Sequence, residues 1–373
     1  MINPLAKELN DTLAGSVVDA LMSDMGKRLY FPNGIISQGG EAAKDAHFAN
    51  GTIGMAVAAG TPIELDSYKK NMPALTPRET VAYAKTAGNP DLRALWKEKI
   101  IEKNPSLKNK QFSLPILVPG LTAVLSYVSD LFVDVEKPLL AADPCWDNYE
   151  LIAAARRGAE FHQFKCFENG KFNIADLEAK MKADAEQYGS VRVILNFPQN
   201  PSGYSPTVSE AKEIVRIVRE LAEAGKKVLV LSDDAYFGLN YEDDIEPQSL
   251  FAYMADLHEN VLAIKADGPT KEDFAWGFRA GFVTFAAKGL SMALLATGIS
   301  RTERDVSYYA ERLNVSPKYL SATIKRVTGH SVTSYIDRHT VPILKDYLGD
   351  ERLSLTQIAE LMNFASLSYF SRY

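Results

Sequence analysis

The sequence has few of the residues that build disulfide frameworks or metal sites. It contains two cysteines, Cys145 and Cys166, and five histidines that are scattered along 373 residues without metal-ligand spacing. Two cysteines are too few for a disulfide framework, and isolated histidines do not supply the clustered ligands that a metal ion needs. We therefore expect no metal site and no fold that depends on disulfides.

Segments that would direct the chain to a membrane are also missing. The sequence shows no signal peptide, membrane span, Walker motif or low-complexity segment. We expect no membrane partner and a cytoplasmic location. The hydrophobic content is 46%, so a chain of this length can bury two cores.

An excess of positive charge is absent as well. The net charge is −6, but residues 301–373 hold 10 Lys and Arg against 8 Asp and Glu, which gives +2 for this segment and −8 for residues 1–300. Only the C-terminal segment has a charge that favours phosphates, and +2 is modest for DNA binding.

Seven apolar runs of strand length are present, and helical patterns such as residues 208–224 alternate with them. This alternation is the βαβ rhythm of a doubly wound α/β domain, so we predict a mostly parallel seven-stranded sheet. The runs are residues 114–118, 138–142, 160–164, 191–196, 228–232, 261–266 and 281–285.

Five short motifs accompany these runs. They are Val118-Pro-Gly-Leu-Thr122, Asp143-Pro-Cys-Trp146, Asn196-Phe-Pro-Gln-Asn-Pro-Ser-Gly203, Asp233-Asp-Ala-Tyr236 and Lys271-Glu-Asp-Phe-Ala-Trp-Gly-Phe-Arg279. In this order they resemble the fold type I aminotransferases of class I/II, over residues 1–290. The resemblance implies pyridoxal 5'-phosphate as cofactor and amino acid and 2-oxo acid substrates. Such an enzyme needs a lysine nucleophile, a carboxylate for the pyridine nitrogen, donors to the phenolate oxygen and a phosphate cradle, and the motifs contain all four.

The resemblance makes Lys271 the catalytic nucleophile. An arginine, Arg279, follows eight positions later, where the family places a phosphate-binding residue. Lys265 is the alternative lysine, but it has Asp273 at that offset.

Asp233 is the candidate partner of the pyridine nitrogen. It follows the run 228–232, which reads as a buried parallel strand that ends where the carboxylate appears, and open α/β sheets bind ligands at that edge. A carboxylate there makes the cofactor ring an electron sink. Asp234 is the alternative, with a turn or helix cap as its expected role.

The resemblance assigns the remaining cofactor contacts. Tyr236 and Asn200 are expected to donate to the phenolate oxygen, and Trp146 is expected to stack on the ring. The Asn200–Pro201 bond is expected to be cis, which X-Pro bonds permit.

The phosphate is expected at the start of a helix. Gly120, Leu121 and Thr122 precede an apolar helical run and offer backbone N–H groups there. Tyr83 matches the position from which family members reach the phosphate of a neighbouring subunit, which implies a homodimer.

The family's C-terminal small domain is not recognisable in the sequence. Residues 291–302 form a junction, and no arginine after Arg279 lies in a context that matches the one that grips a substrate carboxylate. We therefore expect the aminotransferase part to be truncated and its turnover to be impaired.

A repeat occupies the segment after the junction. Residues 306–321 align with residues 355–371, and Ala310 and Ala359 share the small-residue position at a helix crossing, while Leu313 and Met362 cover the core beneath each turn. The repeat resembles the AraC/XylS family of transcription regulators. It implies a small all-α domain over residues 303–373 with two helix-turn-helix units, clipped at its end, and double-stranded DNA as partner.

The first recognition helix is expected over residues 317–325, with Leu320 and Ile324 facing inward. A proline, Pro342, lies inside the connector 332–348, where an interior proline costs about 3 kcal/mol or causes a kink. The residues expected to face DNA are Lys318, Ser321, Ala322 and Lys325 in the first unit and Ser368, Ser371 and Arg372 in the second.

Three interpretations stay open. The chain is an aminotransferase with an added tail, a regulator that senses pyridoxal phosphate or an amino acid and binds DNA, or an artificial join of two truncated proteins with neither function intact.

Overall fold

Seven strands form the central sheet of the first of two compact units, residues Met1–Lys288 and Gly289–Tyr373. The computed structural model describes residues 3–30, 35–48, 50–52, 54–76, 87–288, 318, 321–322, 324–325, 331–349, 354–362 and 370–371. The strands are β3 (Ile116–Val118), β4 (Leu139–Asp143), β5 (Phe161–Lys165), β8 (Ser190–Asn196), β9 (Lys227–Asp233), β10 (Val261–Asp267) and β11 (Gly281–Ala287).

The sheet order is β3-β11-β10-β9-β8-β4-β5. Neighbouring strands from β10 to β5 are parallel, while β11 runs antiparallel to both β10 and β3. The prediction of a mostly parallel seven-stranded α/β sheet is therefore confirmed, and each predicted run overlaps a strand.

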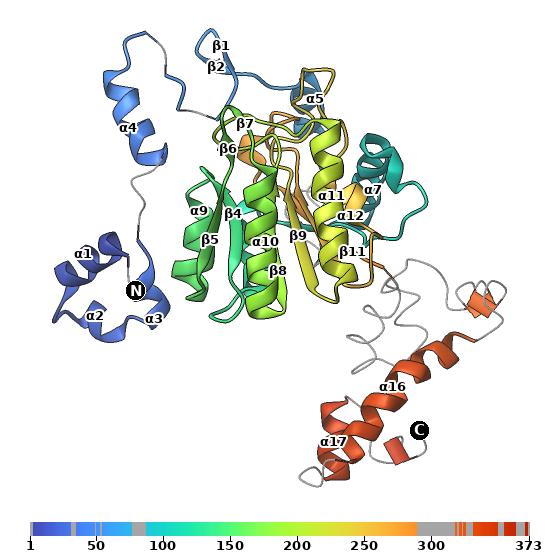
Figure 1. Cartoon of the computed structure of the whole chain (residues 1–373). Coiled ribbons are helices and arrows are strands. Elements are labelled where there is room, and N and C mark those ends of the chain that lie inside the picture. The colour runs from blue at the N-terminus through green and yellow to red at the C-terminus, as the bar shows by residue number, and fades with distance from the viewer. Residues whose placement is uncertain are drawn as a thin grey trace. The chain divides into compact units, whose positions relative to one another are not determined.

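Strand residues alternate between two apolar cores, one on each face of the sheet. In β9, Val228 and Val230 pack into one core while Leu229 and Leu231 pack into the other, as the two-residue period of a strand requires. The helices α10 (Ile174–Tyr188) and α11 (Val208–Glu223) lie side by side across the first face (Figure 1).

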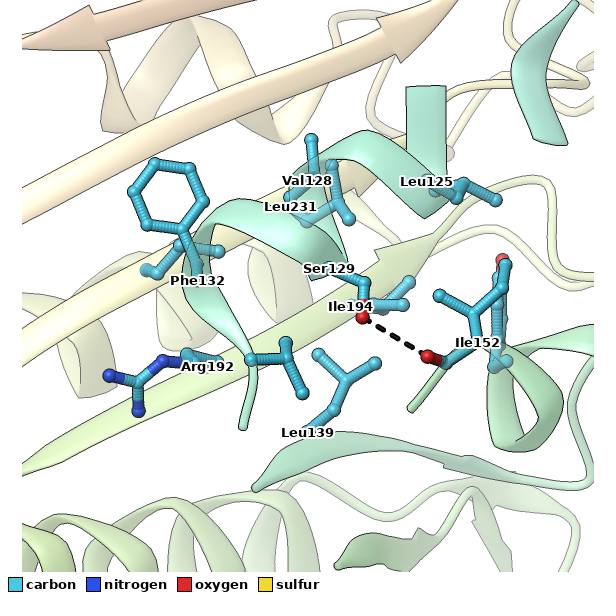
Figure 2. Close-up of a pocket in the computed structure, with 12 residues that line it drawn as sticks. Leu125, Val128, Ser129, Phe132, Leu139, Ile152, Arg192, Ile194 and Leu231 are labelled. Carbon is cyan, nitrogen blue, oxygen red and sulfur yellow. Dashed lines mark hydrogen bonds between the residues drawn. The ribbon is translucent and has the colours of Figure 1, made fainter. Parts of the chain in front are cut away.

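Helix α8 (Leu121–Phe132) covers the other face. It contributes Val124, Leu125 and Val128 to the second core, together with Tyr149. Figure 2 shows a pocket inside this core, where Ser129 Oγ of α8 donates a 3.2 Å hydrogen bond to the carbonyl of Ile152. Most of the lining residues are apolar, with Ser129 and Arg192 as the exceptions apart from the hydroxyl of Tyr149, so this pocket is a packing feature of the core.

Other α-helices complete the described part of the first unit. They are α1 (Pro4–Leu13), α2 (Val17–Leu21), α3 (Asp24–Arg28), α4 (Ile35–Asp45), α5 (Asp66–Asn71), α7 (Pro90–Lys103), α9 (Asn148–Glu150) and α12 (Leu250–Met254). Two short hairpins pair β1 (Val57–Ala58) with β2 (Thr61–Pro62) and β6 (Phe167–Glu168) with β7 (Lys171–Phe172).

The described residues of the second unit are helical for the most part. Helix α16 (Val332–Leu348) spans the predicted connector and continues through position 342, so the connector is one helix; the cost or kink expected from the proline stays a prediction. Helix α17 (Leu355–Leu361) follows. A small apolar cluster joins the two helices and position 370; its members are Ile358, Ala359, Met362 and Phe370, with Leu344 packed against them.

Membrane-spanning helices and metal-binding clusters are both absent from the described part of the chain. No described helix is long and apolar enough to cross a membrane. Within the same residues, no cluster of histidine, cysteine or carboxylate side chains could hold a metal ion.

Candidate active site

Asp233 is the last residue of β9 and lies buried at the carboxyl edge of the sheet, with 3% of its surface exposed. The hydroxyl of Tyr149 donates a 2.5 Å hydrogen bond to Oδ2 of this carboxylate. The backbone N–H of Ala235 donates to Oδ1 at 3.2 Å. Both partners are neutral donors, so neither cancels the negative charge.

The environment of Asp233 opposes its ionisation. Burial raises the pKa of this carboxyl to about 6, although the Tyr149 hydroxyl and the Ala235 N–H act in the opposite direction. A cation placed against the carboxylate would favour the charged form. The side chain is therefore suited to hold a protonated ring nitrogen.

Asn196 connects Asp233 to the loop that follows β8. Its Nδ2 donates to the backbone carbonyl of Asp233 at 2.8 Å, and its Oδ1 accepts from the N–H of Asn200 at 2.8 Å. The Asn200–Pro201 bond is cis, as the sequence predicts. This arrangement holds half-buried Asn200 close to the end of β9.

Asp234 opens the turn after β9, where its carbonyl accepts a 3.2 Å hydrogen bond from the N–H of Phe237, and its side chain has further partners. Its side chain is buried, forms an ion pair with Lys265 and accepts a 2.6 Å hydrogen bond from Ser249 Oγ. Lys265 also lies 3.4 Å from Oδ2 of Asp267. Burial acts to lower the pKa of Lys265, but the two carboxylates raise it above its usual value. Lys265 is thus a buried residue held between two carboxylates.

Lys271 lies in the connection between β10 and β11. Its Nζ donates a 3.1 Å hydrogen bond to the carbonyl of Gly54 and lies 5.0 Å from the centre of the Tyr236 ring. A Cβ atom on Gly54 would be 2.9 Å from that Nζ, so a side chain at position 54 would displace the amine. The two predicted residues Lys271 and Tyr236 are therefore brought together.

Arg279 reaches the start of helix α8. A Cβ atom on Gly120 would lie 2.9 Å from Nη2 of Arg279, which places the guanidinium against the N-cap of the helix. Gly120 has φ +86° and supplies no side-chain cap, and Leu121 and Thr122 are the first two helical residues. A guanidinium beside N–H groups at a helix N-terminus binds anions such as phosphate.

The other predicted cofactor residues lie nearby or outside the described residues. Trp146 is half-buried and packs edge-on against Tyr149, with ring centres 5.8 Å apart. Tyr83 lies outside the described residues.

Two side chains that contact Asp233, those of Tyr149 and Asn196, are not predicted from the sequence. Tyr149 follows Trp146 by three residues, and Asn196 opens one of the five motifs. Their positions in or beside the motifs are the signal by which the sequence could have indicated them. Neither residue type indicates by itself which strand end it will contact.

The predicted DNA-facing residues are described in part. Lys318, Ser321, Ala322 and Lys325 are exposed and helical, whereas Ile324 on the same segment is half-buried. Ser371 is exposed and helical. Ser368, Arg372, Leu320 and residues 291–317 lie outside the described residues.

Solved aminotransferases share this fold. An aminotransferase from Anaerococcus prevotii aligns with 92% of this chain and 79% of its own, with a TM-score of 0.63 and 20% identity. The alanine aminotransferase of Pyrococcus furiosus aligns with 88% of this chain and 78% of its own, with a TM-score of 0.57 and 19% identity. At these identities the likeness concerns the fold alone.

Sequence comparison places the chain within a family. The model of the class I and II aminotransferases matches residues 55–362, and the chain belongs to that family. The match continues past position 290, through most of the segment in which the sequence predicts helix-turn-helix units. The predicted boundary between an aminotransferase part and an AraC-type part stays a prediction.

Curated relatives match over shorter stretches. A probable N-acetyl-LL-diaminopimelate aminotransferase of Bacillus subtilis is 31% identical over 119 residues, which are 32% of this chain and 27% of the relative. A probable aspartate/prephenate aminotransferase of Rickettsia felis is 24% identical over 204 residues, which are 54% of this chain and 46% of the relative. The chain thus spans less than half the length of these relatives.

Proposed function

We propose that this chain binds pyridoxal 5'-phosphate and transfers an amino group between an amino acid and a 2-oxo acid. The observation that carries the proposal is the convergence of Lys271, Asp233 and Arg279 at one edge of the sheet, beside the uncapped start of α8. Family membership supports it, because class I and II aminotransferases generally use this cofactor.

The donor set fits the cofactor at three points. Arg279 and the N–H groups of Leu121 and Thr122 would hold the phosphate, while buried Asp233 would face the pyridine nitrogen. Tyr236, Asn200 and Trp146 would contact the ring and its phenolate oxygen. When bound, the cofactor supplies an electron sink that stabilises negative charge at the substrate α-carbon.

The protein residues then have distinct tasks. Lys271 would provide the amine that attaches the cofactor and would accept and return the substrate α-proton. Asp233, in its charged form, would keep the ring nitrogen protonated. Tyr149 and Ala235 orient the Asp233 carboxylate through the hydrogen bonds that they donate to it.

Borohydride trapping tests the role of Lys271. Reduction in the presence of pyridoxal phosphate, followed by peptide mapping, should leave a pyridoxyl label on Lys271. A label on Lys265, or no label, would overturn the assignment. In the same assay Asp233→Asn should still be labelled at Lys271. A separate measurement of substrate α-proton exchange with solvent should show a loss of about 10²-fold or more in this variant, since removal of that proton depends on the electron sink.

A homodimer is part of the proposal, because the family position matched by Tyr83 contacts the neighbouring subunit's phosphate. Sedimentation of the full chain, with and without the cofactor, measures this directly. A monomer that binds the cofactor with undiminished affinity would contradict the role proposed for Tyr83.

Binding of double-stranded DNA by residues 303–373 is a second candidate function. The apolar cluster at Ile358, Ala359, Met362 and Phe370 favours it, because Ala359 and Met362 occupy the positions that the repeat assigns to a helix crossing and its core. The exposure of Lys318 and Lys325 on a helical segment also supports it. With cofactor binding retained, the chain would be a regulator that senses pyridoxal phosphate or an amino acid.

A salt titration of a labelled duplex with the full chain tests DNA binding. With two to four phosphate contacts, the log-log slope should be about −2 to −4. Lys318→Ala and Lys325→Ala should each weaken binding, while Lys182→Ala on α10 serves as the charge-matched control. Undetectable binding at low salt, or an equal loss in the control, would remove this candidate.

A further inference from the structure

Helix α7 contributes two lysines to the two carboxylates that directly follow Lys271. Lys99 Nζ lies 3.0 Å from Oδ1 and 2.7 Å from Oδ2 of Asp273, and Lys103 forms an ion pair with Glu272. Lys99 and Lys103 are one helical turn apart, so both face the same side of α7. One helix face therefore holds two consecutive residues of the loop that carries the amine.

These two ion pairs are partly shielded from water. The exposed fractions of the four side chains lie between 26% and 31%. Solvent screens such pairs less than it screens pairs on an open surface, where long side chains exchange partners freely. The carboxylates are also held by further contacts.

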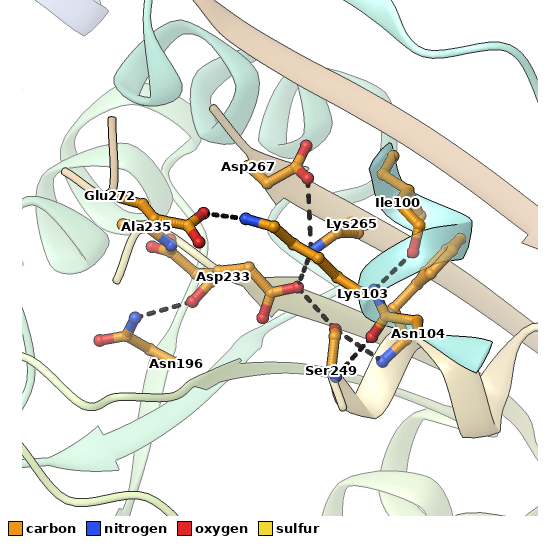
Figure 3. A network of polar contacts seen from close by, with 12 residues as sticks. Ile100, Lys103, Asn104, Asn196, Asp233, Ala235, Ser249, Lys265, Asp267 and Glu272 are labelled. Carbon is orange, nitrogen blue, oxygen red and sulfur yellow. Dashed lines mark hydrogen bonds and ion pairs between the residues drawn. The ribbon is translucent and has the colours of Figure 1, made fainter. Parts of the chain in front are cut away.

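Glu272 lies against the turn that carries Tyr236. A Cβ atom on Gly238 would be 2.5 Å from Oε1 of Glu272, and Gly238 has φ +92°, so only glycine leaves room for this carboxylate. Figure 3 shows Glu272 reaching the Lys103 amine beside the buried network of Lys265. Glu272 thus connects α7, the Lys271 loop and the Tyr236 turn.

Asp273 is held from a second side. Its backbone carbonyl accepts a 2.7 Å hydrogen bond from the hydroxyl of Tyr68 on α5. Its side chain meanwhile pairs with Lys99. Backbone and side chain of the same residue are therefore fixed by different helices.

We propose that Lys103 and Lys99 are positioning residues for Lys271, acting through Glu272 and Asp273. This role rests on the proposed function, and it means that residues of α7 fix the position of the reacting amine. A lysine side chain has four rotatable bonds, so a fixed backbone on its C-terminal side and a fixed Tyr236 turn limit where Nζ can lie. Small displacements of a reacting group cost large factors in rate.

The first experiment needs no cofactor. Acylation of Lys271 by an N-hydroxysuccinimide ester, followed by mass spectrometry, reports how tightly the amine is held against Gly54 and Tyr236. Lys103→Met and Glu272→Gln should each accelerate labelling of Lys271 on the order of threefold, the range expected for a partly exposed ion pair. The exchanged pair Lys103→Glu with Glu272→Lys should return the rate toward that of the unaltered protein.

Lys97→Met is the matched control. Lys97 lies on the same helix but donates to the carbonyl of Phe112, at 2.7 Å, and not to the Lys271 loop. Its removal perturbs the docking of α7 alone and should leave the Lys271 labelling rate unchanged. Equal acceleration in Lys97→Met and Lys103→Met would show that α7 acts only through general stability and would overturn the inference.

A second readout uses the cofactor. The rate of covalent attachment of pyridoxal phosphate to Lys271, trapped by borohydride at timed intervals, should fall about tenfold in Lys103→Met and Glu272→Gln. If the unaltered protein did not attach pyridoxal phosphate, the proposed function would be wrong, and the acylation rates would still test the positioning role. If all variants attached the cofactor and were acylated at the rates of the unaltered protein, the positioning role alone would be wrong.

Discussion

Two adjacent carboxylates at the end of β9 have opposite electrostatic environments. Asp234 is paired with Lys265, so its charge is already compensated. Asp233 has a hydroxyl and a backbone N–H as partners, and burial raises its pKa to about 6. When a positively charged ring nitrogen binds, a buried carboxylate without a cation gains more electrostatic stabilisation than one that is already paired. This difference supports Asp233 over Asp234 as the cofactor partner.

The raised pKa of Asp233 has a consequence for stability without cofactor. The pKa of an aspartate in the unfolded chain is near 3.9. Between about pH 4 and 6, Asp233 therefore keeps a proton in the folded state that it has released in the unfolded state. The stabilisation is complete below pH 4 and is lost as the pH rises through about 6. Asp233→Asn lacks this titration.

We therefore expect Asp233→Asn to gain stability relative to the unaltered protein between pH 4 and 7. The gain should be on the order of 3 kcal/mol in the free energy of unfolding, measured by urea denaturation of the cofactor-free chain. A stability difference that is flat across this pH range would contradict the burial argument.

The ion network of Lys265 should be essential for stability. Lys265→Met leaves the carboxylates of Asp234 and Asp267 buried without a cation, which should cost about 3–5 kcal/mol. Lys110→Met is the control, because it removes a pair with Asp256 in which the aspartate is 48% exposed. Urea denaturation of both variants at pH 7 gives the two losses in the free energy of unfolding. Equal losses would show that the burial of the ion pair does not determine its contribution to stability.

The direction of one strand explains why the site residues meet. Because β11 is antiparallel to β10, the connection from residue 268 to 280 leaves and re-enters the sheet at the same edge. Strand β3 is antiparallel to β11, so α8 also starts at that edge. The amine of Lys271, the guanidinium of Arg279 and the start of α8 are therefore placed together by strand order.

Close contact between β11 and the start of α8 can be tested with alanine. A Cβ atom on Gly281 would lie 2.6 Å from the carbonyl carbon of Gly120 and 2.8 Å from the N of Leu121. Gly281→Ala must shift backbone, which should cost about 1–3 kcal/mol and weaken pyridoxal phosphate binding at the phosphate end.

Gly277→Ala is the control, since an added Cβ there meets no heavy atom within 4 Å. Thermal unfolding and a fluorescence titration with pyridoxal phosphate measure the two effects. If both alanine variants behaved alike, the tight packing at Gly281 would not be what places the phosphate site.

At the scale of the whole molecule, two compact units each have an apolar core of their own. The first unit holds two large clusters around the sheet, and the described part of the second holds one small cluster. Met362 is fully buried in that small cluster.

Met362→Ala should therefore affect the second unit alone. The lost packing should cost about 2–5 kcal/mol and lower one calorimetric transition, while the second transition and the affinity for pyridoxal phosphate stay unchanged. A single transition that moves as a whole would mean that the two units unfold together.

The sequence by itself determined the sheet and which candidate site residues follow its strands. Apolar runs of five or six residues form strands because their side chains fill cores on both faces, and this burial pattern is local. Residues that follow parallel strands must lie at the carboxyl edge. The position of Asp233 at that edge follows from this rule, and the motif spacing adds Lys271 and Arg279 to the same site.

Only the tertiary structure decided which side chains pair. The role of Asp234, the bond from Tyr149 to Asp233 and the contacts of Lys99 and Lys103 with the Lys271 loop join segments far apart in the chain. A charge on a helix looks the same in sequence whether it faces water or a distant carboxylate. Its partner is set by helix rotation and strand order, which depend on the packing of the whole unit.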